Sequence, residues 1–322
     1  LHRLIRRQRQ MCIRDRSKKP IERASFTFGG AEKVQEGYFI TDACIGCKLC
    51  YSKCPQKCID ISAKPAVIQQ KNCLHCGNCF EICPARAIMK RGNAMNQEER
   101  RRFLIEELLR ERLSCRRQEI PADTDRQKVL LRSLMNVRHP GAISQRFLEV
   151  QDAYLQGELA AKKITRLSEL SPLQNGIYLW RGDITTLDCG AIVNAANSGM
   201  TGCYQPCHNC IDNCIHTYAG VQLRLNALDH GAAVFEEPTG QAKITPAYNL
   251  PCDYVIHTVG PIVQGKLTRQ HCKLLESCYR SCLTLADENQ VPSIAFCCIS
   301  TGVFMFPNDK AAEIAVRTVQ EY

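Results

Sequence analysis

Apolar side chains recur with two different periods along this chain, and the change of period separates two regions. Between residues 96 and 156 apolar residues lie three to four positions apart among Glu and Arg, which predicts amphipathic helices. The predicted helices cover residues 96–111, 127–136 and 145–156. Beyond residue 171 short apolar runs alternate with further helical patterns. The predicted strands are 177–180, 191–193, 254–259 and 293–299, and the predicted helices are 220–228 and 274–288. This order predicts a three-layer α/β sandwich that binds its ligand at the carboxyl ends of the strands.

A repeat of cysteines precedes these regions. The run Cys44-x2-Cys47-x2-Cys50-x3-Cys54 is followed by Pro55, and the same spacing returns 29 residues later. The second run consists of Cys73, Cys76, Cys79 and Cys83, followed by Pro84. This spacing is typical of the ligands of cubane [4Fe-4S] clusters, and a pair of zinc ribbons is the less favoured alternative. Cys58 lies outside both runs and is assigned no role.

Each run is predicted to give its fourth cysteine to the cluster of the other run. The predicted ligands of cluster 1 are Cys44, Cys47, Cys50 and Cys83, and those of cluster 2 are Cys73, Cys76, Cys79 and Cys54. Residues 38–91 resemble bacterial two-cluster ferredoxins, which implies a small α+β domain. The cysteines leave open whether the clusters transfer electrons or only stabilise the domain, and electron transfer is the favoured interpretation.

Three metal-binding side chains follow one of the predicted strands. Cys203, His208 and Cys210 lie within eight positions, and they suit tetrahedral zinc with one coordination position left open. An open coordination position indicates a catalytic metal site rather than a structural one. The alternatives are a structural four-cysteine site that includes Cys207 and Cys214, or buried thiols without a metal.

Polar and glycine-containing segments follow several predicted strands. Asn194 and Asn197 come after the strand at 191–193, where side-chain amides can bind hydroxyl groups. Residues 182–185 read Gly-Asp-Ile-Thr. Residues 300–304 read Ser-Thr-Gly-Val-Phe, and a glycine-containing turn there can direct backbone N–H groups at a pyrophosphate.

From about residue 95 to the end, these motifs together resemble the zinc-containing macrodomains that hydrolyse ADP-ribose from modified proteins. The resemblance implies a three-layer α/β/α macrodomain with a helical N-terminal extension, and a zinc ion held by Cys203, His208 and Cys210. The residues that it implies in ADP-ribose binding are Asp183, Ile184, Asn197, Ile211, Asp212, Asn213, Ser300, Thr301, Gly302, Val303 and Phe304. The residues that it implies in catalysis are Asn194, Asn197 and Asp212.

The function implied by this resemblance is zinc-dependent removal of mono-ADP-ribose from proteins, with a fused iron-sulfur electron-transfer module. In such a site Asp183 accepts a hydrogen bond from the adenine amine, and Asp212 orients a neighbouring group or acts as a base. Sirtuin-like ADP-ribosyltransferases and lipoyl carrier proteins are the implied partners. Two alternatives stay open: an ADP-ribose-binding reader without turnover, and a ferredoxin-type electron carrier.

Charge and cysteine content limit the partners and the compartment. The 322 residues carry a formal charge of +10, but six Arg and one Asp in residues 1–16 supply +5 of it, so no nucleic-acid partner is expected. No apolar run approaches the roughly 18 to 20 residues that a bilayer span requires, so no membrane partner is expected. Of the 22 cysteines, eight lie in the two runs and three in the zinc motif. These ligands require reduced thiolates, which predicts a cytoplasmic protein.

Four segments are expected along the chain. Residues 1–16 are interpreted as an adapter-like leader, similar to a cloning or assembly scar, with no ordered structure. Residues 17–94 form the two-cluster module, 95–170 the helical extension, and 171–322 the macrodomain. The composition changes abruptly near residue 95, which suggests a fusion of two reading frames. The chain stops within a helix-like pattern, so the macrodomain is expected to be C-terminally truncated, with a sheet that lacks an edge element.

Overall fold

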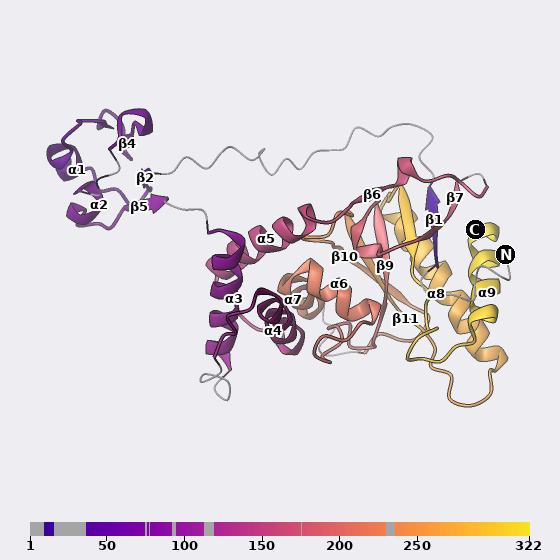
Figure 1. The fold of residues 1–322 in the computed structure, drawn as a ribbon. Coiled ribbons are helices and arrows are strands. Elements are labelled where there is room, and N and C mark those ends of the chain that lie inside the picture. The colour runs from indigo at the N-terminus through magenta and orange to yellow at the C-terminus, as the bar shows by residue number, and fades with distance from the viewer. Residues whose placement is uncertain are drawn as a thin grey trace. The chain divides into compact units, whose positions relative to one another are not determined.

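The structure is a computed structural model that describes residues 10–15, 37–74, 76, 78–91, 95–112, 119–174, 176–229 and 236–322. The chain divides into two compact units (Figure 1). One unit consists of residues 22–96, and the other of residues 1–21 and 97–322. The smaller unit is therefore an insertion, in sequence, within the larger one.

The smaller unit has two similar halves, as its cysteine repeat predicts. Its antiparallel strand pairs are β2 (Gly37–Ile40) with β5 (Ile88–Arg91) and β3 (Ile59–Asp60) with β4 (Val67–Ile68). Its helices are α1 (Leu49–Lys53), η1 (Gln70–Asn72) and α2 (Asn78–Ile82). α1 and α2 each begin inside one cysteine run, so each run wraps from a loop into the first turn of a helix. The predicted small α+β module is confirmed.

Three helices form the extension of the larger unit: α3 (Gln97–Glu111), α4 (Thr124–Val137) and α5 (Gln145–Ala160). Asp123 and Ser144 cap α4 and α5, because their side-chain oxygens accept hydrogen bonds from backbone N–H groups of the first turn. Leu104, Leu131 and Phe147 are buried, one from each helix, as the amphipathic pattern predicts.

A six-stranded sheet in the order β10-β11-β9-β12-β1-β7 forms the centre of the larger unit. The strands are β1 (Gln10–Asp15), β7 (Ile177–Arg181), β9 (Ala191–Ala196), β10 (Ala242–Pro246), β11 (Tyr254–Val259) and β12 (Ser293–Phe296). β11 and β12 run parallel to β9. β1 is antiparallel to both β12 and β7, so β7 points the same way as the other three. Four carboxyl ends therefore lie at one edge of the sheet.

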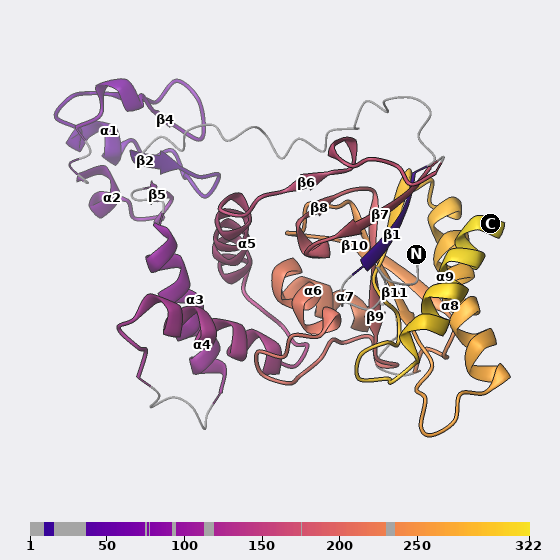
Figure 2. The ribbon, with the colours of Figure 1, turned by 45° about the vertical axis from the view of Figure 1, so that its right-hand side comes forward.

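Helices cover both faces of this sheet, which confirms the three-layer α/β/α sandwich. They are α6 (Ile211–Ala219), α7 (Val221–Asp229), α8 (Arg269–Glu288) and α9 (Asn308–Glu321). Figure 2 shows α8 and α9 on one face and α6 on the other. Smaller elements are the parallel pair β6 (Thr165–Arg166) and β8 (Leu187–Asp188), with η3 (Leu167–Glu169) and η4 (Ile184–Thr186). The core includes Ile192, Ile256, Leu275 and Phe296, all almost completely buried.

The strand β1 contradicts the expectation that residues 1–16 have no ordered structure. Gln10–Asp15 lies between β7 and β12, with Cys12 opposite both Leu179 and Phe296. Six residues are too few to reveal a period in the sequence, and the hydrogen bonds that fix this strand come from partners more than 150 positions away. The strand occupies an interior position, and β7 and β10 form the edges of the sheet.

Several predicted boundaries differ from the structure. β9 continues to Ala196, so Asn194 lies within the strand rather than after it, and β12 ends at Phe296 instead of residue 299. The length of β9 could not be predicted from its apolar run, because that run covers only the first three positions and a polar residue follows it inside the strand. β10 and α6 have no predicted counterpart.

Candidate active site

Loops from three strands carry the predicted site residues to one edge of the sheet. Asp183 follows β7, Asn197 follows β9, and residues 300–304 follow β12. Since these strands are parallel, their carboxyl ends open toward the same region. Asp212 reaches Asn194 and Asn197 from the first turn of α6.

Asp183 caps the short helix η4 with one carboxylate oxygen. Its Oδ1 accepts from Thr185 N at 3.0 Å and from Thr185 Oγ1 at 2.7 Å. Oδ2 makes no hydrogen bond to any described residue, so it is available to an external donor. Ile184 beside it is buried. The preceding Gly182 packs against Trp180 so closely that an added Cβ would overlap Cζ2 of the indole.

The carboxylate of Asp212 is buried between two asparagine amides. Oδ1 accepts from Asn194 Nδ2 at 2.8 Å, and Oδ2 accepts from Asn197 Nδ2 at 3.3 Å. Burial raises the pKa of Asp212 to about 6, while the bond from Asn194 and the charge of Arg224 oppose that rise. At neutral pH most of the carboxylate is therefore ionised and able to accept a proton.

Asn194 is completely buried and joins Asp212 to a histidine. Its Nδ2 also donates to His257 Nδ1 at 3.1 Å, and His257 Nε2 lies 3.0 Å from Thr245 Oγ1. Since Nδ1 accepts, we assign the proton of the neutral imidazole to Nε2, which donates to Thr245. Asn194 Oδ1 is buried with no hydrogen-bond partner among the described residues, which leaves one acceptor for a ligand hydroxyl.

Two basic side chains near Asp212 were not predicted from the sequence. His216 Nε2 lies 3.5 Å from Asp212 Oδ1, one helical turn along α6. Burial, then the neighbouring His257, keeps the pKa of His216 well below its usual value, so this imidazole is neutral. The nearby positive charge belongs to Arg224, which is also buried. The i, i+4 spacing of Asp212 and His216 was the available sequence signal.

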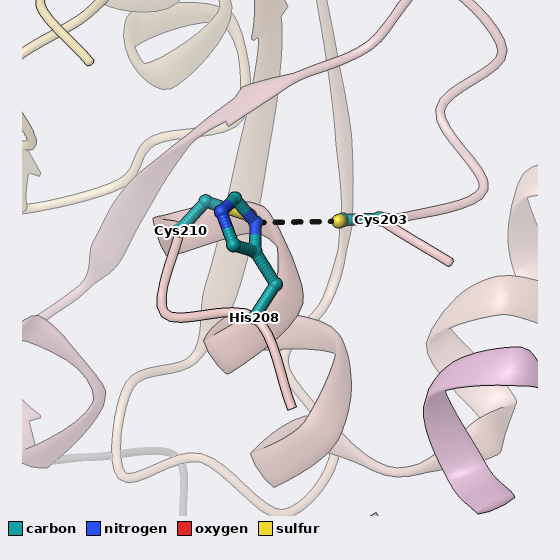
Figure 3. Close-up of side chains that lie close together, drawn as sticks. All are labelled: Cys203, His208 and Cys210. Carbon is teal, nitrogen blue, oxygen red and sulfur yellow. Dashed lines mark hydrogen bonds between the residues drawn. The ribbon is translucent and has the colours of Figure 1, made fainter. Parts of the chain in front are cut away.

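The three predicted zinc ligands converge (Figure 3). One ligand atom each from Cys203, His208 and Cys210 lies within 4.8 Å of the other two. Cys203 Sγ and His208 Nδ1 are 3.6 Å apart. Tetrahedral zinc with bonds of about 2.0–2.3 Å holds a sulfur and a nitrogen roughly 3.6 Å apart, so the observed spacing fits the metal.

The surroundings of this trio favour three ligands over a four-cysteine site. Cys207 Sγ lies 3.5 Å from Val129 O, and Cys214 Sγ lies 3.7 Å from Arg132 Nη2, so both have other contacts. Cys210 caps α6, and its Sγ accepts from Asn213 N at 3.4 Å. Without a cation, burial raises the pKa of Cys210 to about 12, and a bound cation reverses that effect by stabilising the thiolate.

The loop after β12 is held by bonds that leave several amides unused. Met305 N donates to Gly302 O and Phe306 N donates to Ser300 O, each at 3.0 Å. Ser300 has a φ of 63°, in the left-handed region. The N–H groups of Gly302, Val303 and Phe304 have no hydrogen-bond partner among the described residues. Consecutive amides without partners among the described residues can bind an anion.

Comparison with known proteins identifies both parts of the chain. A model of the Macro domain matches residues 193–315. A protein-ADP-ribose hydrolase from Treponema medium is 61% identical over 238 residues, which cover 71% of this chain and 89% of that protein. A protein-ADP-ribose hydrolase from Staphylococcus aureus (strain MSSA476) is 47% identical over 233 residues, covering 70% of this chain and 86% of the relative.

The chain belongs to the macrodomain family of protein-ADP-ribose hydrolases. Among solved structures, a Trypanosoma brucei macrodomain in complex with ADP is 30% identical, with a TM-score of 0.45. That match covers 59% of this chain and 83% of the other. The match to the Macro domain model confirms the expected macrodomain fold.

In the smaller unit, a model of the 4Fe-4S dicluster domain matches residues 43–87. Two cavities in this unit are lined by its cysteines. One cavity is lined by Cys44, Cys47, Cys50 and Cys83, and the other by Cys54, Cys73, Cys76 and Cys79 together with Cys58. Each cavity thus contains three cysteines of one run and the fourth of the other. The residues present fit two [4Fe-4S] clusters.

One residue expected to bind ADP-ribose in this macrodomain has a different set of contacts. Asn213 is completely buried, and its Nδ2 donates to the backbone oxygens of Cys203 and Gln205 at 3.3 and 2.9 Å. Its side chain therefore supports the ligand loop, which we define as residues 203–210. Ile211, next to Cys210, is half-buried.

Proposed function

We propose that this chain is a zinc-dependent hydrolase that removes mono-ADP-ribose from modified proteins. The observation that carries the proposal is the convergence of Cys203, His208 and Cys210 at one end of α6, whose first turn also holds the buried carboxylate of Asp212. An open-sided metal site beside a carboxylate has no evident use in a protein that only binds ADP-ribose. The names of the relatives from Treponema medium and Staphylococcus aureus support the same activity.

ADP-ribose is proposed to lie along the carboxyl edge of the sheet. Oδ2 of Asp183, which bonds to no described residue, suits the adenine amine, and the buried Ile184 lies beside Asp183. The backbone amides of residues 302–304 have no partner among the described residues and suit the pyrophosphate. Binding of the pyrophosphate then needs no lysine. Asn197 is proposed to contact the distal ribose, and Phe304 to pack near it.

Cys203, His208 and Cys210 would hold the zinc ion. When bound, it would polarise a ribose oxygen, orient the substrate or lower the pKa of a water molecule. Asp212 would accept the proton of the attacking water, since its buried carboxylate lies in the first turn of α6, two residues after Cys210. Asn194 and Asn197 donate to opposite oxygens of Asp212 and so fix the orientation of the base.

Release of free ADP-ribose tests this proposal. The substrate is a mono-ADP-ribosylated lipoyl carrier protein, the acceptor that the family resemblance suggests, alongside other modified proteins. Wild type is expected to release ADP-ribose, and His208→Ala to lose turnover while calorimetry still detects ADP-ribose binding. Tight binding without turnover by zinc-loaded wild type, on several acceptor chemistries, would instead identify a reader.

We also propose that the two-cluster module transfers electrons. Cys47 and Cys76, one ligand of each predicted cluster, are exposed, which brings both clusters close to the surface of their unit. Reduction of the anaerobically prepared protein by dithionite, with reoxidation by an added electron acceptor, tests this role. Clusters that remain unreduced at low potential would indicate a structural role only.

A further inference from the structure

Helix α4 of the extension contacts the ligand loop, although the two segments lie more than 60 residues apart in sequence. The ligand loop has no regular secondary structure before α6 begins at Ile211. Few backbone hydrogen bonds within it hold its shape; His208 N donates to Gln205 O at 3.2 Å. The position of its three metal ligands therefore depends on contacts with neighbouring elements.

Arg132 on α4 supplies the first of these contacts. Its Nη2 donates to the backbone oxygen of His208 at 2.7 Å and to Asn213 Oδ1 at 3.1 Å. Asn213 Nδ2 donates in turn to the backbone oxygens of Cys203 and Gln205. One guanidinium thus connects the backbone of His208, through a single amide, to the backbone of Cys203.

Asn136, one turn further along α4, holds the middle of the loop. Its Oδ1 accepts from Cys207 N at 2.9 Å, and its Nδ2 donates to Thr217 Oγ1 at 2.9 Å. Cys207 has a φ of 53°, a left-handed conformation that costs a non-glycine residue free energy. The buried amide of Asn136 therefore stabilises a turn immediately before His208 that the loop alone would not favour.

The carboxyl end of α4 makes a third connection. Arg224 Nη1 donates to the backbone oxygens of Asn136 and Arg138 at 2.9 and 2.6 Å. The Arg224 guanidinium lies 4.4 Å from the ring centroid of Tyr204, and His139 stacks on the same ring at 5.0 Å. Tyr204 directly follows Cys203, so this stack fixes the start of the ligand loop.

We propose that Arg132 and Asn136 are positioning residues that preorganise the ligand loop for its metal ion, which makes α4 of the extension part of the metal site. The inference rests on the proposed zinc assignment. Metal affinity depends on partners that orient the ligands, and the loss of one such partner typically weakens binding about 10- to 100-fold. Arg132 orients the backbone of His208 rather than its ring.

Zinc affinity of the full chain tests the inference, measured by competition with a fluorescent zinc chelator. Arg132→Gln removes the charged fork, and Arg126→Gln is the matched control on an exposed position of the same helix. The dissociation constant of Arg132→Gln is expected to rise about 10- to 100-fold, and that of Arg126→Gln to stay unchanged. Arg132→Lys, which keeps one charged donor, is expected to fall between the two.

Unfolding followed by the single tryptophan, Trp180, separates positioning from general stability. If Arg132→Gln unfolds at the same denaturant concentration as wild type, its loss of zinc affinity is caused by the altered ligand loop and not by lower stability. If Arg132→Gln does not fold, Arg132→Lys is compared with Arg126→Gln instead. Equal zinc affinity in the folded Arg132 and Arg126 variants would overturn the inference and leave the proposed function intact. Wild type that binds no zinc would contradict both the inference and the proposed zinc-dependent function.

Discussion

Protonation of His257 is expected to destabilise the macrodomain, and His257→Gln should remove that effect. His257 is 2% exposed, and its Nδ1 accepts a hydrogen bond from Asn194, which in turn holds Asp212. Burial lowers the pKa of His257 from 6.5 to about 4. The folded protein therefore holds this imidazole neutral at a pH where the unfolded chain protonates it.

The sign and size of the effect follow from these two pKa values. Between about pH 6.5 and pH 4 the unfolded chain binds the extra proton, so stability falls as the pH falls. A pKa shift from 6.5 to about 4 changes the free energy of unfolding by about 3 kcal/mol in total. About 2 kcal/mol of this stability is lost between pH 8 and pH 5. For a domain of this size that loss lowers the melting temperature by about 4–8 °C.

Urea unfolding of wild type and His257→Gln at pH 8 and pH 5 measures this difference. Trp180 is the only tryptophan, so its fluorescence reports on the strand β7 of the sheet. A glutamine amide can accept and donate without titrating, and its packing cost is the same at both pH values. The variant should therefore lose about 2 kcal/mol less than wild type. If wild type and His257→Gln lose the same free energy of unfolding between pH 8 and pH 5, His257 is not buried in its neutral form.

Three further predictions concern separate parts of the chain. Cys58→Ser should keep both clusters, with about eight irons by metal analysis, whereas Cys54→Ser should lose cluster 2. Equal loss of iron in the two variants would contradict the ligand assignment. Deletion of residues 1–21 removes an interior strand and should lower the melting temperature of the macrodomain by about 10 °C or more; an unchanged melt would refute the pairing of β1. Gly182→Ala should displace Trp180 and weaken ADP-ribose binding by calorimetry, and wild-type affinity would count against that packing.

The features that could be predicted from the sequence are those whose parts lie close together along the chain. The cysteine runs and the trio of Cys203, His208 and Cys210 have fixed short spacings, because a small metal centre needs its ligands on one or two loops. The amphipathic helices and apolar strands follow from local periodicity in the same way.

The features that could not be predicted depend on contacts between distant segments. Arg132 and Asn136 are hydrogen-bonded to loop residues more than 70 positions away, His208 and Cys207, and nothing in the amphipathic pattern of α4 marks them. Asn194 was expected after the strand, but β9 continues to Ala196, and Asn194 pairs with His257 of β11 inside the sheet. β1 depends on partners at both of its sides.

The dependence of turnover on zinc tests the central claim most directly. The full chain, stripped of zinc by a chelator that leaves the clusters intact, is titrated with zinc while free ADP-ribose released from a mono-ADP-ribosylated protein is measured. The rate is expected to be near zero without zinc and to rise in proportion to bound metal, up to about one equivalent at Cys203, His208 and Cys210. Full turnover by the zinc-free protein would contradict the account.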